Sequence, residues 1–149
     1  MSNYAYVATR ARSRRSRLLP AEAYNQLLNL EHAEIARYIQ DLEYRREIDR
    51  YGSTLSGADL IETALVDNLA KDIGDFLSFS KGKLRDILHV YAEKYRIENL
   101  KNIVRGINQN MDKQNLERLV CPINDSDKEL YNKLYDSKTV EDMVSSLEG

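Results

Sequence analysis

Five arginines lie within eight residues near the start of the chain: Arg10, Arg12, Arg14, Arg15 and Arg17. Their guanidinium groups can neutralise phosphates, which suggests nucleic-acid binding. They can equally form a docking face for an acidic protein partner, because arginine is favoured at interfaces. A third interpretation is a solvated helix face on which the arginine stems cover apolar neighbours. No aromatic residues are interleaved with these arginines for base stacking, and the net charge of the chain is −2, so nucleic-acid binding has the least support.

The two histidines, His32 and His89, do not form a metal-binding motif. The nearest match to a carboxylate-bridged di-iron site is the single spacing from Asp86 to His89, and such a site needs Glu-x-x-His pairs on two helices. No His-x-x-x-His pair exists. Cys121 is the only cysteine, so a thiolate zinc cluster and an internal disulfide are both excluded. We therefore predict no metal and no cofactor.

Catalytic motifs are equally sparse. Ser78 and Lys81 match a Ser-x-x-Lys pattern, but the companion motifs of that chemistry are missing. The chain has no Gly-x-Ser-x-Gly elbow and no glycine-rich phosphate loop. The carboxylate pairs Asp72/Asp75 and Glu43/Glu47 have helical spacing, which is typical of a solvated face. We predict no catalytic residue and a protein that is not an enzyme.

Composition points to an ordinary globular chain with an uneven charge distribution. The 149 residues fit a single helical domain over 1–149. Residues 1–30 hold five arginines against one acid, a charge of +4, which leaves −6 for the remainder. The apolar residues near the start precede the arginines, the reverse of a signal peptide, and no run is long enough for a membrane helix. We expect a cytoplasmic protein with a basic end that binds a partner.

The apolar residues of the segments that must position these side chains recur with the period of an α-helix. Tyr4, Val7, Ala8, Ala11 and Leu18 form one stripe of an opening helix. Pro20 suits the first turn of a second helix from residue 21 to about 30, and a third is predicted over 33–50. A loop over 53–57 then precedes the longest apolar pattern, over 60–77. Further segments are predicted at 84–91, 97–107, 127–135 and 140–147.

The third predicted helix places Ile35, Ile39, Leu42 and Ile48 inward, and Gly52 ends it. Gly82 separates the long pattern from the segment at 84–91, and Pro122 ends the pattern around residues 116–119. No segment alternates with period two, so we predict no strands. The predicted fold class is all-α, a continuous multi-helix array without linkers.

Several strings, in order, resemble one family of rotary ATPase proteins, the C subunits of archaeal-type (A-type) enzymes and the d subunits of vacuolar (V-type) ones. They are NYAYVATRAR at residues 3–12, LLP at 18–20, EIARYI at 34–39, YRREI at 44–48, DLIE at 59–62 and YRIENLKNIVRG at 95–106. The last string is the most specific. The resemblance covers the whole chain but under half of a typical family member. One departure lies at residues 121–125, where CPIND replaces a Pro-Ala-Gly-like turn.

The resemblance implies a non-catalytic adapter that seats the central stalk on the membrane proteolipid ring during proton or sodium transport. It implies the first of three similar helical bundles in a funnel-shaped protein, held at the membrane only through the complex. The implied partners are the central-stalk subunits and the proteolipid ring. Arg10, Arg12, Arg14, Arg15 and Arg17 are the residues we expect to contact them. The alternative is a small helical module that binds nucleic acid through the same arginines.

Overall fold

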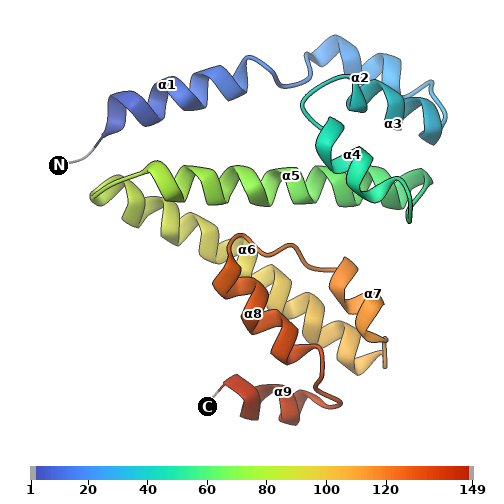
Figure 1. Ribbon diagram of the computed structural model, residues 1–149, viewed down its shortest axis with the longest axis vertical. Coiled ribbons are helices and arrows are strands. Elements are labelled where there is room, and N and C mark those ends of the chain that lie inside the picture. The colour runs from blue at the N-terminus through green and yellow to red at the C-terminus, as the bar shows by residue number, and fades with distance from the viewer. Residues whose placement is uncertain (1–2, 148–149) are drawn as a thin grey trace. The chain divides into compact units, whose positions relative to one another are not determined.

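The computed structural model describes residues 3–147, which form nine α-helices and no strand (Figure 1). The predicted all-α fold class is confirmed. The helices are α1 (Tyr4–Arg15), α2 (Ala21–Leu27), α3 (His32–Gln40), α4 (Arg45–Tyr51), α5 (Gly57–Phe79), α6 (Lys83–Asn108), α7 (Lys113–Arg118), α8 (Asp125–Leu134) and α9 (Val140–Leu147). Within residues 3–147, no helix combines the length and the apolarity that crossing a membrane requires.

The chain divides into two compact units, Met1–Leu69 (unit 1) and Ala70–Gly149 (unit 2). The boundary falls inside α5, so this helix contributes its first part to unit 1 and its second part to unit 2. The sequence pattern predicted α5 well, because its apolar residues at 60–77 keep helical spacing throughout and the helix extends only two or three residues beyond them.

The core of unit 1 joins α3, α4 and the first part of α5. Ile39, Ile48, Leu60 and Ala64 are its buried members. The predicted continuous helix over 33–50 is wrong, because the chain turns at residues 41–44. Ile39 and Ile48 are nine residues apart, about two and a half turns, and would lie on opposite sides of one straight helix. The turn brings both into the same cluster.

The two helices that open unit 1 are mostly exposed. Val7 is the buried residue of α1, whereas Tyr4 and Leu18 of the same predicted stripe are exposed. Ala23 is the buried residue of α2. The start of α3 is fixed by a reciprocal capping box, in which the side chains of Glu31 and Glu34 each accept a hydrogen bond from the other's backbone N–H.

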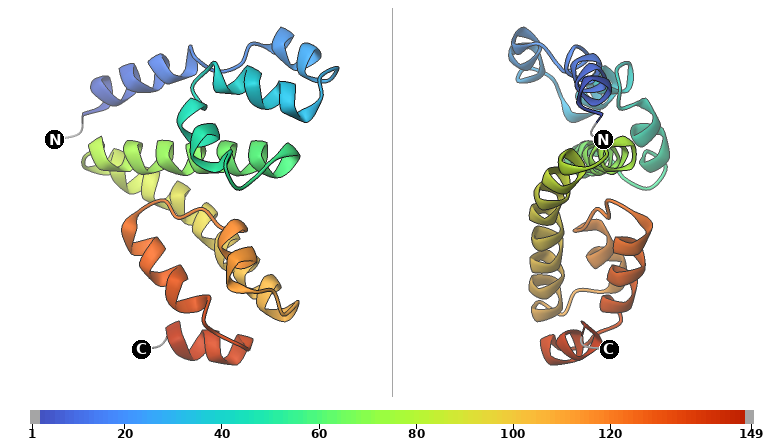
Figure 2. Two further views of the ribbon diagram at one scale, coloured as in Figure 1. Left: turned by 45° about the vertical axis from the view of Figure 1, so that its right-hand side comes forward. Right: turned by 90° about the vertical axis from the view of Figure 1, so that its left-hand side faces the viewer.

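Unit 2 is built around α6, a single helix where the sequence predicted two segments at 84–91 and 97–107. The intervening residues 92–96 hold no glycine or proline, so nothing in them ends the helix. Gly82 separates α5 from α6 as predicted, and its φ of 58° lies in the region that favours glycine. In Figure 2, α7 and α8 lie on the same side of α6.

Unit 2 has two buried clusters. The first joins the second part of α5 to α6 through Ala70, Ile73, Leu77, Ala92 and Ile123. The second joins α6 to α7, α8 and α9, and its buried residues are Ile103, Ile107, Leu116, Val120, Tyr131, Leu134, Tyr135 and Met143. Ala92, Ile103 and Ile107 lie on one stripe of α6, so a single face of this helix serves both clusters along its length.

Candidate functional site

The arginine cluster lies on α1 and just after it. Arg10, Arg12, Arg15 and Arg17 are exposed and Arg14 is half-buried. The guanidinium carbon of Arg10 lies 5.6 Å from the centre of the Tyr6 ring, within range of a cation–π contact. Arg12, Arg14 and Arg15 occupy the last turn of α1, where the helix dipole favours positive charge. The arrangement presents a dense positive surface at the C-terminal end of this helix.

Arg17 also has a partner within unit 1. Its guanidinium Nη1 donates to both carboxylate oxygens of Glu43, at 2.9 and 2.8 Å. Both side chains are about half exposed, so the pair contributes at most about 1 kcal/mol to stability. Because Glu43 belongs to the turn between α3 and α4, this ion pair links the segment after α1 to that turn.

The other sequence candidates are not brought together into a reactive centre. Ser78 Oγ donates to the backbone carbonyl of Asp75 at 2.7 Å, a local helix contact. Within residues 3–147, His, Cys, Asp and Glu side chains do not gather in groups of three or more that could hold a metal ion. The predictions of no metal, no cofactor and no catalytic residue stay predictions.

The most family-specific string, residues 95–106, positions the segment that follows α7. Asn99 Nδ2 donates to the backbone carbonyl of Cys121 at 2.9 Å, and the backbone N–H of Cys121 donates to Asn99 Oδ1 at 3.3 Å. Asn102 Nδ2 donates to the carbonyl of Leu119 at 3.0 Å. Two asparagines one helical turn apart thus satisfy backbone groups of a segment that lies in no helix. We call these contacts of Asn99 and Asn102 the clamp. Sequence reasoning missed the clamp, because it joins residues about twenty positions apart.

Arg96, from the same string, is paired with Asp127 at the start of α8. Its Nε lies 2.8 Å from Asp127 Oδ1, and its Nη1 contacts Glu93. Burial disfavours the positive charge, but the hydrogen bond to Glu93 and the negative charge of Asp127 outweigh it, so the pKa of Arg96 is raised. Asp127 Oδ2 in turn accepts the backbone N–H of Ile123 at 3.2 Å. The pair fixes the far end of the same segment.

Two glycines permit close approach within unit 2. A Cβ at Gly106 would lie 2.3 Å from Cδ2 of Leu116, and a Cβ at Gly74 would lie 2.6 Å from the carbonyl oxygen of Ile123. Gly74 therefore lets the second part of α5 touch the backbone of the segment at 121–125. This is the segment whose sequence departs from the turn expected by resemblance, and its described conformation rests on α5 and α6.

Comparison with known proteins matches the chain to one family along almost its whole length. The model of the ATP synthase (C/AC39) subunit family matches residues 7–149. The C subunit of the A-type ATP synthase of Haloferax volcanii is 38% identical over 148 residues, 99% of this chain and 42% of the relative. That of Archaeoglobus fulgidus is 34% identical over 146 residues, 98% of this chain and 42% of the relative.

A third relative, the C subunit of the A-type ATP synthase of Methanosarcina mazei, is 42% identical over 105 residues, 70% of this chain and 29% of the relative. The chain thus spans about 42% of the length of the first two relatives. No solved structure matches the chain. The family match, the relatives and the all-α fold agree with the strings at residues 3–12 and 95–106, and the chain belongs to the ATP synthase (C/AC39) subunit family.

Proposed function

We propose that this chain is the N-terminal part of a non-catalytic adapter in a V-type or A-type rotary ATPase. The adapter couples the central stalk to the membrane proteolipid ring during proton or sodium transport, while other subunits synthesise or hydrolyse ATP. Residues 1–149 form the first of three similar helical bundles, on the cytoplasmic side and peripheral to the membrane through the ring. The observation that carries the proposal is the family match over residues 7–149.

The packing of unit 2 supports a role in transmitting force. Asn99, Asn102 and Arg96 hold the segment between α7 and α8 against α6, and glycine at 74 and 106 allows backbone-close contacts. Such close-packed interiors have low compressibility and transmit strain. An adapter under torque needs this stiffness more than it needs reactive side chains.

The proposed contact surface for the stalk or ring is the arginine surface, defined as Arg10, Arg12, Arg14, Arg15 and Arg17. Arginine binds carboxylates with good geometry and is enriched at interfaces. Arg17 pairs with Glu43, so a partner must compete with that carboxylate for its guanidinium group. This surface is positive, so a partner that binds it carries a complementary negative patch.

The test is calorimetric titration of the full chain with the purified central-stalk subunits at two salt concentrations. We expect saturable one-to-one binding that weakens as salt rises, since exposed charges are screened. Replacing Arg10, Arg12, Arg14 and Arg15 by alanine should weaken binding by about tenfold or more. A matched control replaces four exposed basic residues elsewhere, Arg85, Arg118, Lys128 and Lys133, and should leave binding within about threefold.

Two outcomes separate the parts of the proposal. If the four-arginine variant binds as well as the unchanged chain, the arginine surface is wrong while the adapter role stands. If neither the chain nor a full-length relative binds the stalk subunits, the adapter role fails. Tight, salt-dependent binding of duplex DNA in place of the stalk would support the nucleic-acid alternative.

A further inference from the structure

The outward face of α6 carries a row of β-branched residues. Two of them lie outside the cores of unit 2, and the third, Val104, only borders one. Val90, Ile97 and Val104 follow one another at intervals of seven residues, so they lie along one line of the helix. Val90 is 75% exposed and Ile97 50% exposed, and Val104 is half-buried. Ile87, beside this row, is 61% exposed. We call the line of Val90, Ile97 and Val104 the α6 seam.

Most of the seam lies away from the helices that pack on α6, and only Val104 also contacts the cluster formed with α7, α8 and α9. Ala92 faces α5, while Ile103 and Ile107 face the cluster formed with α7, α8 and α9. Figure 2 shows α7 and α8 on one side of α6 and no described helix of unit 2 on the opposite side. A soluble helix ordinarily keeps polar residues on such a face, so a heptad row of Val and Ile there is typical of a docking seam.

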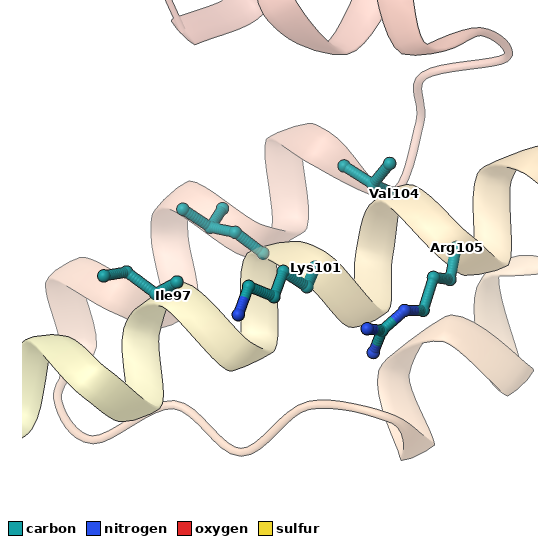
Figure 3. Close-up of a pocket in the computed structure, with 5 residues that line it drawn as sticks. Ile97, Lys101, Val104 and Arg105 are labelled. Carbon is teal, nitrogen blue, oxygen red and sulfur yellow. The ribbon is translucent and has the colours of Figure 1, made fainter.

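Lysines alternate with the apolar residues of the seam. Lys94 and Lys101 each follow a seam residue by four positions, which is the second core position of a heptad. Both are exposed. In Figure 3, Lys101 and Arg105 lie along the same hollow as Ile97 and Val104, a shallow depression of about 320 Å³ that Leu100 completes. The face is therefore apolar along one line, and along the next it carries Lys94, Lys101 and Arg105 around a single acid, Glu98, for a net positive charge.

The charge pattern decides what can occupy the seam. In a parallel pair of copies, Lys94 would face Lys94 and Lys101 would face Lys101, which repel. In an antiparallel pair, the lysine positions would lie against Val and Ile of the other copy and leave both apolar rows incompletely covered. A helix from another protein avoids both the repulsion between lysines and the incomplete cover of the apolar row. It does so if its aliphatic residues pack on the seam and its carboxylates face the lysines.

We propose that the α6 seam binds an amphipathic α-helix of another protein, with aliphatic residues at one heptad position and Asp or Glu at the other. This inference rests on the geometry of unit 2 and is independent of the arginine surface and of the adapter role. The present contacts of the lysines do not block such a partner. Lys101 pairs with Glu98 at 2.8 Å in an exposed contact, and Lys94 lies 5.9 Å from the Tyr95 ring centre. Both ammonium groups keep donors for a carboxylate.

The experiment uses the full 149-residue chain and two synthetic helical peptides of four heptads. The acidic peptide has Leu at one core position and Glu at the other, and the basic peptide has Lys in place of Glu. Fluorescence anisotropy of labelled peptide should show binding of the acidic peptide and, at the same concentrations, about tenfold weaker binding of the basic one. The double variant K94E/K101E should reverse this preference, and I97D should abolish binding of both peptides.

A matched control, K128E/K133E, makes the same change of net charge at exposed positions of α8 and should leave both affinities within about twofold. Because the changed residues on α6 are exposed, far-UV circular dichroism should show unchanged helix content in each variant. Equal binding of the two peptides, or a preference that K94E/K101E does not reverse, would overturn the proposal. Sedimentation showing a dimer that I97D dissociates and the acidic peptide does not would assign the seam to a second copy and overturn it as well.

Discussion

At the scale of single residues, Asn99 uses both ends of its amide on one partner. It accepts the backbone N–H of Cys121 and donates to the backbone carbonyl of the same residue. Asn99 is 8% exposed, so its removal leaves two backbone groups unpaired beside the core. We expect Asn99→Ala to lower the free energy of unfolding by about 2–4 kcal/mol, measured by urea denaturation. Asn102→Ala removes the bond to the Leu119 carbonyl and a contact with Arg105, both exposed to solvent, and should cost about 1 kcal/mol or less. If Asn99→Ala and Asn102→Ala lowered the free energy of unfolding equally, the result would contradict the buried double hydrogen bond of Asn99.

Gly74 and Gly106 offer a second test, because their neighbours differ in how easily they move. The oxygen near Gly74 belongs to the backbone of Ile123, whereas the atom near Gly106 is a terminal methyl of Leu116. A leucine methyl can rotate away, and alanine gains helix propensity of about 0.5–1 kcal/mol over glycine. Gly74→Ala should therefore destabilise by about 1–3 kcal/mol and more than Gly106→Ala does, as measured by thermal and urea unfolding. A stabilising Gly74→Ala would show that α5 does not approach the segment so closely.

Tyr135 gives the protein a predictable response to alkaline pH. Burial, reinforced by the negative charge of Glu117, raises the pKa of Tyr135 well above its ordinary value of 10. The unfolded chain therefore loses this proton at a lower pH than the folded chain does. The stability contributed by this group is fully present below pH 10 and falls above it, by up to about 1.4 kcal/mol per pH unit.

Urea unfolding at pH 8, 10 and 11 checks this response. The unchanged chain should lose stability between pH 10 and 11 more steeply than Tyr135→Phe does, because the variant has no phenol to titrate at this position. Burial also raises the pKa of Tyr131, so Tyr131→Phe should shift the slope in the same direction. Tyr24→Phe, at an exposed position, serves as the control. Parallel slopes for Tyr135→Phe and the unchanged chain would contradict the buried placement of Tyr135.

At the scale of elements, the sequence predicts a helix best where one apolar stripe runs without interruption. The α5 pattern at residues 60–77 does so, and the helix is where the pattern predicts it. The prediction of one continuous third helix is wrong because Ile39 and Ile48 would lie on opposite faces of it. Both residues pack on Leu60 in the core of unit 1, and this requires the turn between α3 and α4. The split predicted within α6 has the opposite cause. There one face stays buried, but between Ala92 and Ile103 it carries Arg96 and Asn99, which pair with Asp127 and the backbone of Cys121. These polar residues interrupt the apolar pattern.

The candidate sites also divide into those the sequence predicts and those it does not. A cluster such as Arg10–Arg17 is visible in the sequence, because its members are neighbours and their charge needs no fold to be recognised. The link from Arg17 to Glu43 and the clamp from Asn99 to Cys121 depend on chain reversals of about twenty residues or more. Residue types predict such contacts poorly, since many other polar residues offer the same groups. Resemblance singled out residues 95–106 without saying that they hold a neighbouring segment in place.

The start of α8 provides a prediction about a whole element. Asn124 Oδ1 accepts the backbone N–H of Asp127 at 2.9 Å, which satisfies one of the unpaired donors of the first turn of α8. Asp127 Oδ2 accepts the backbone N–H of Ile123, just before the helix. Asn124→Ala should cost about 0.5–2 kcal/mol of stability, whereas Asn124→Ser keeps a capping oxygen and should cost less. Chemical denaturation of the two variants measures the difference. The same cost for both would show that the side-chain cap does not stabilise α8.

At the scale of the whole molecule, charge and packing are separated along the chain. The first thirty residues hold a charge of +4 and only two of the residues described as buried, Val7 and Ala23. Most of the buried residues lie in the acidic remainder, above all in the clusters of unit 2. A basic, weakly buried end attached to a well-packed body suits a protein whose early residues meet a partner while later helices keep their shape.

This separation predicts that the chain competes with a longer relative for the same partner. If the arginine surface meets the central stalk, the 149-residue chain should displace a full-length relative from a preformed complex with the stalk subunits in a concentration-dependent way. The variant lacking Arg10, Arg12, Arg14 and Arg15 should compete about tenfold less well. Analytical size-exclusion chromatography with a labelled full-length relative measures the displaced fraction. Competition that survives loss of the four arginines but disappears in I97D would move the principal contact from α1 to the α6 seam. No displacement at any concentration, with the full-length complex intact, would place the stalk contacts in the part of the relatives that this chain does not span.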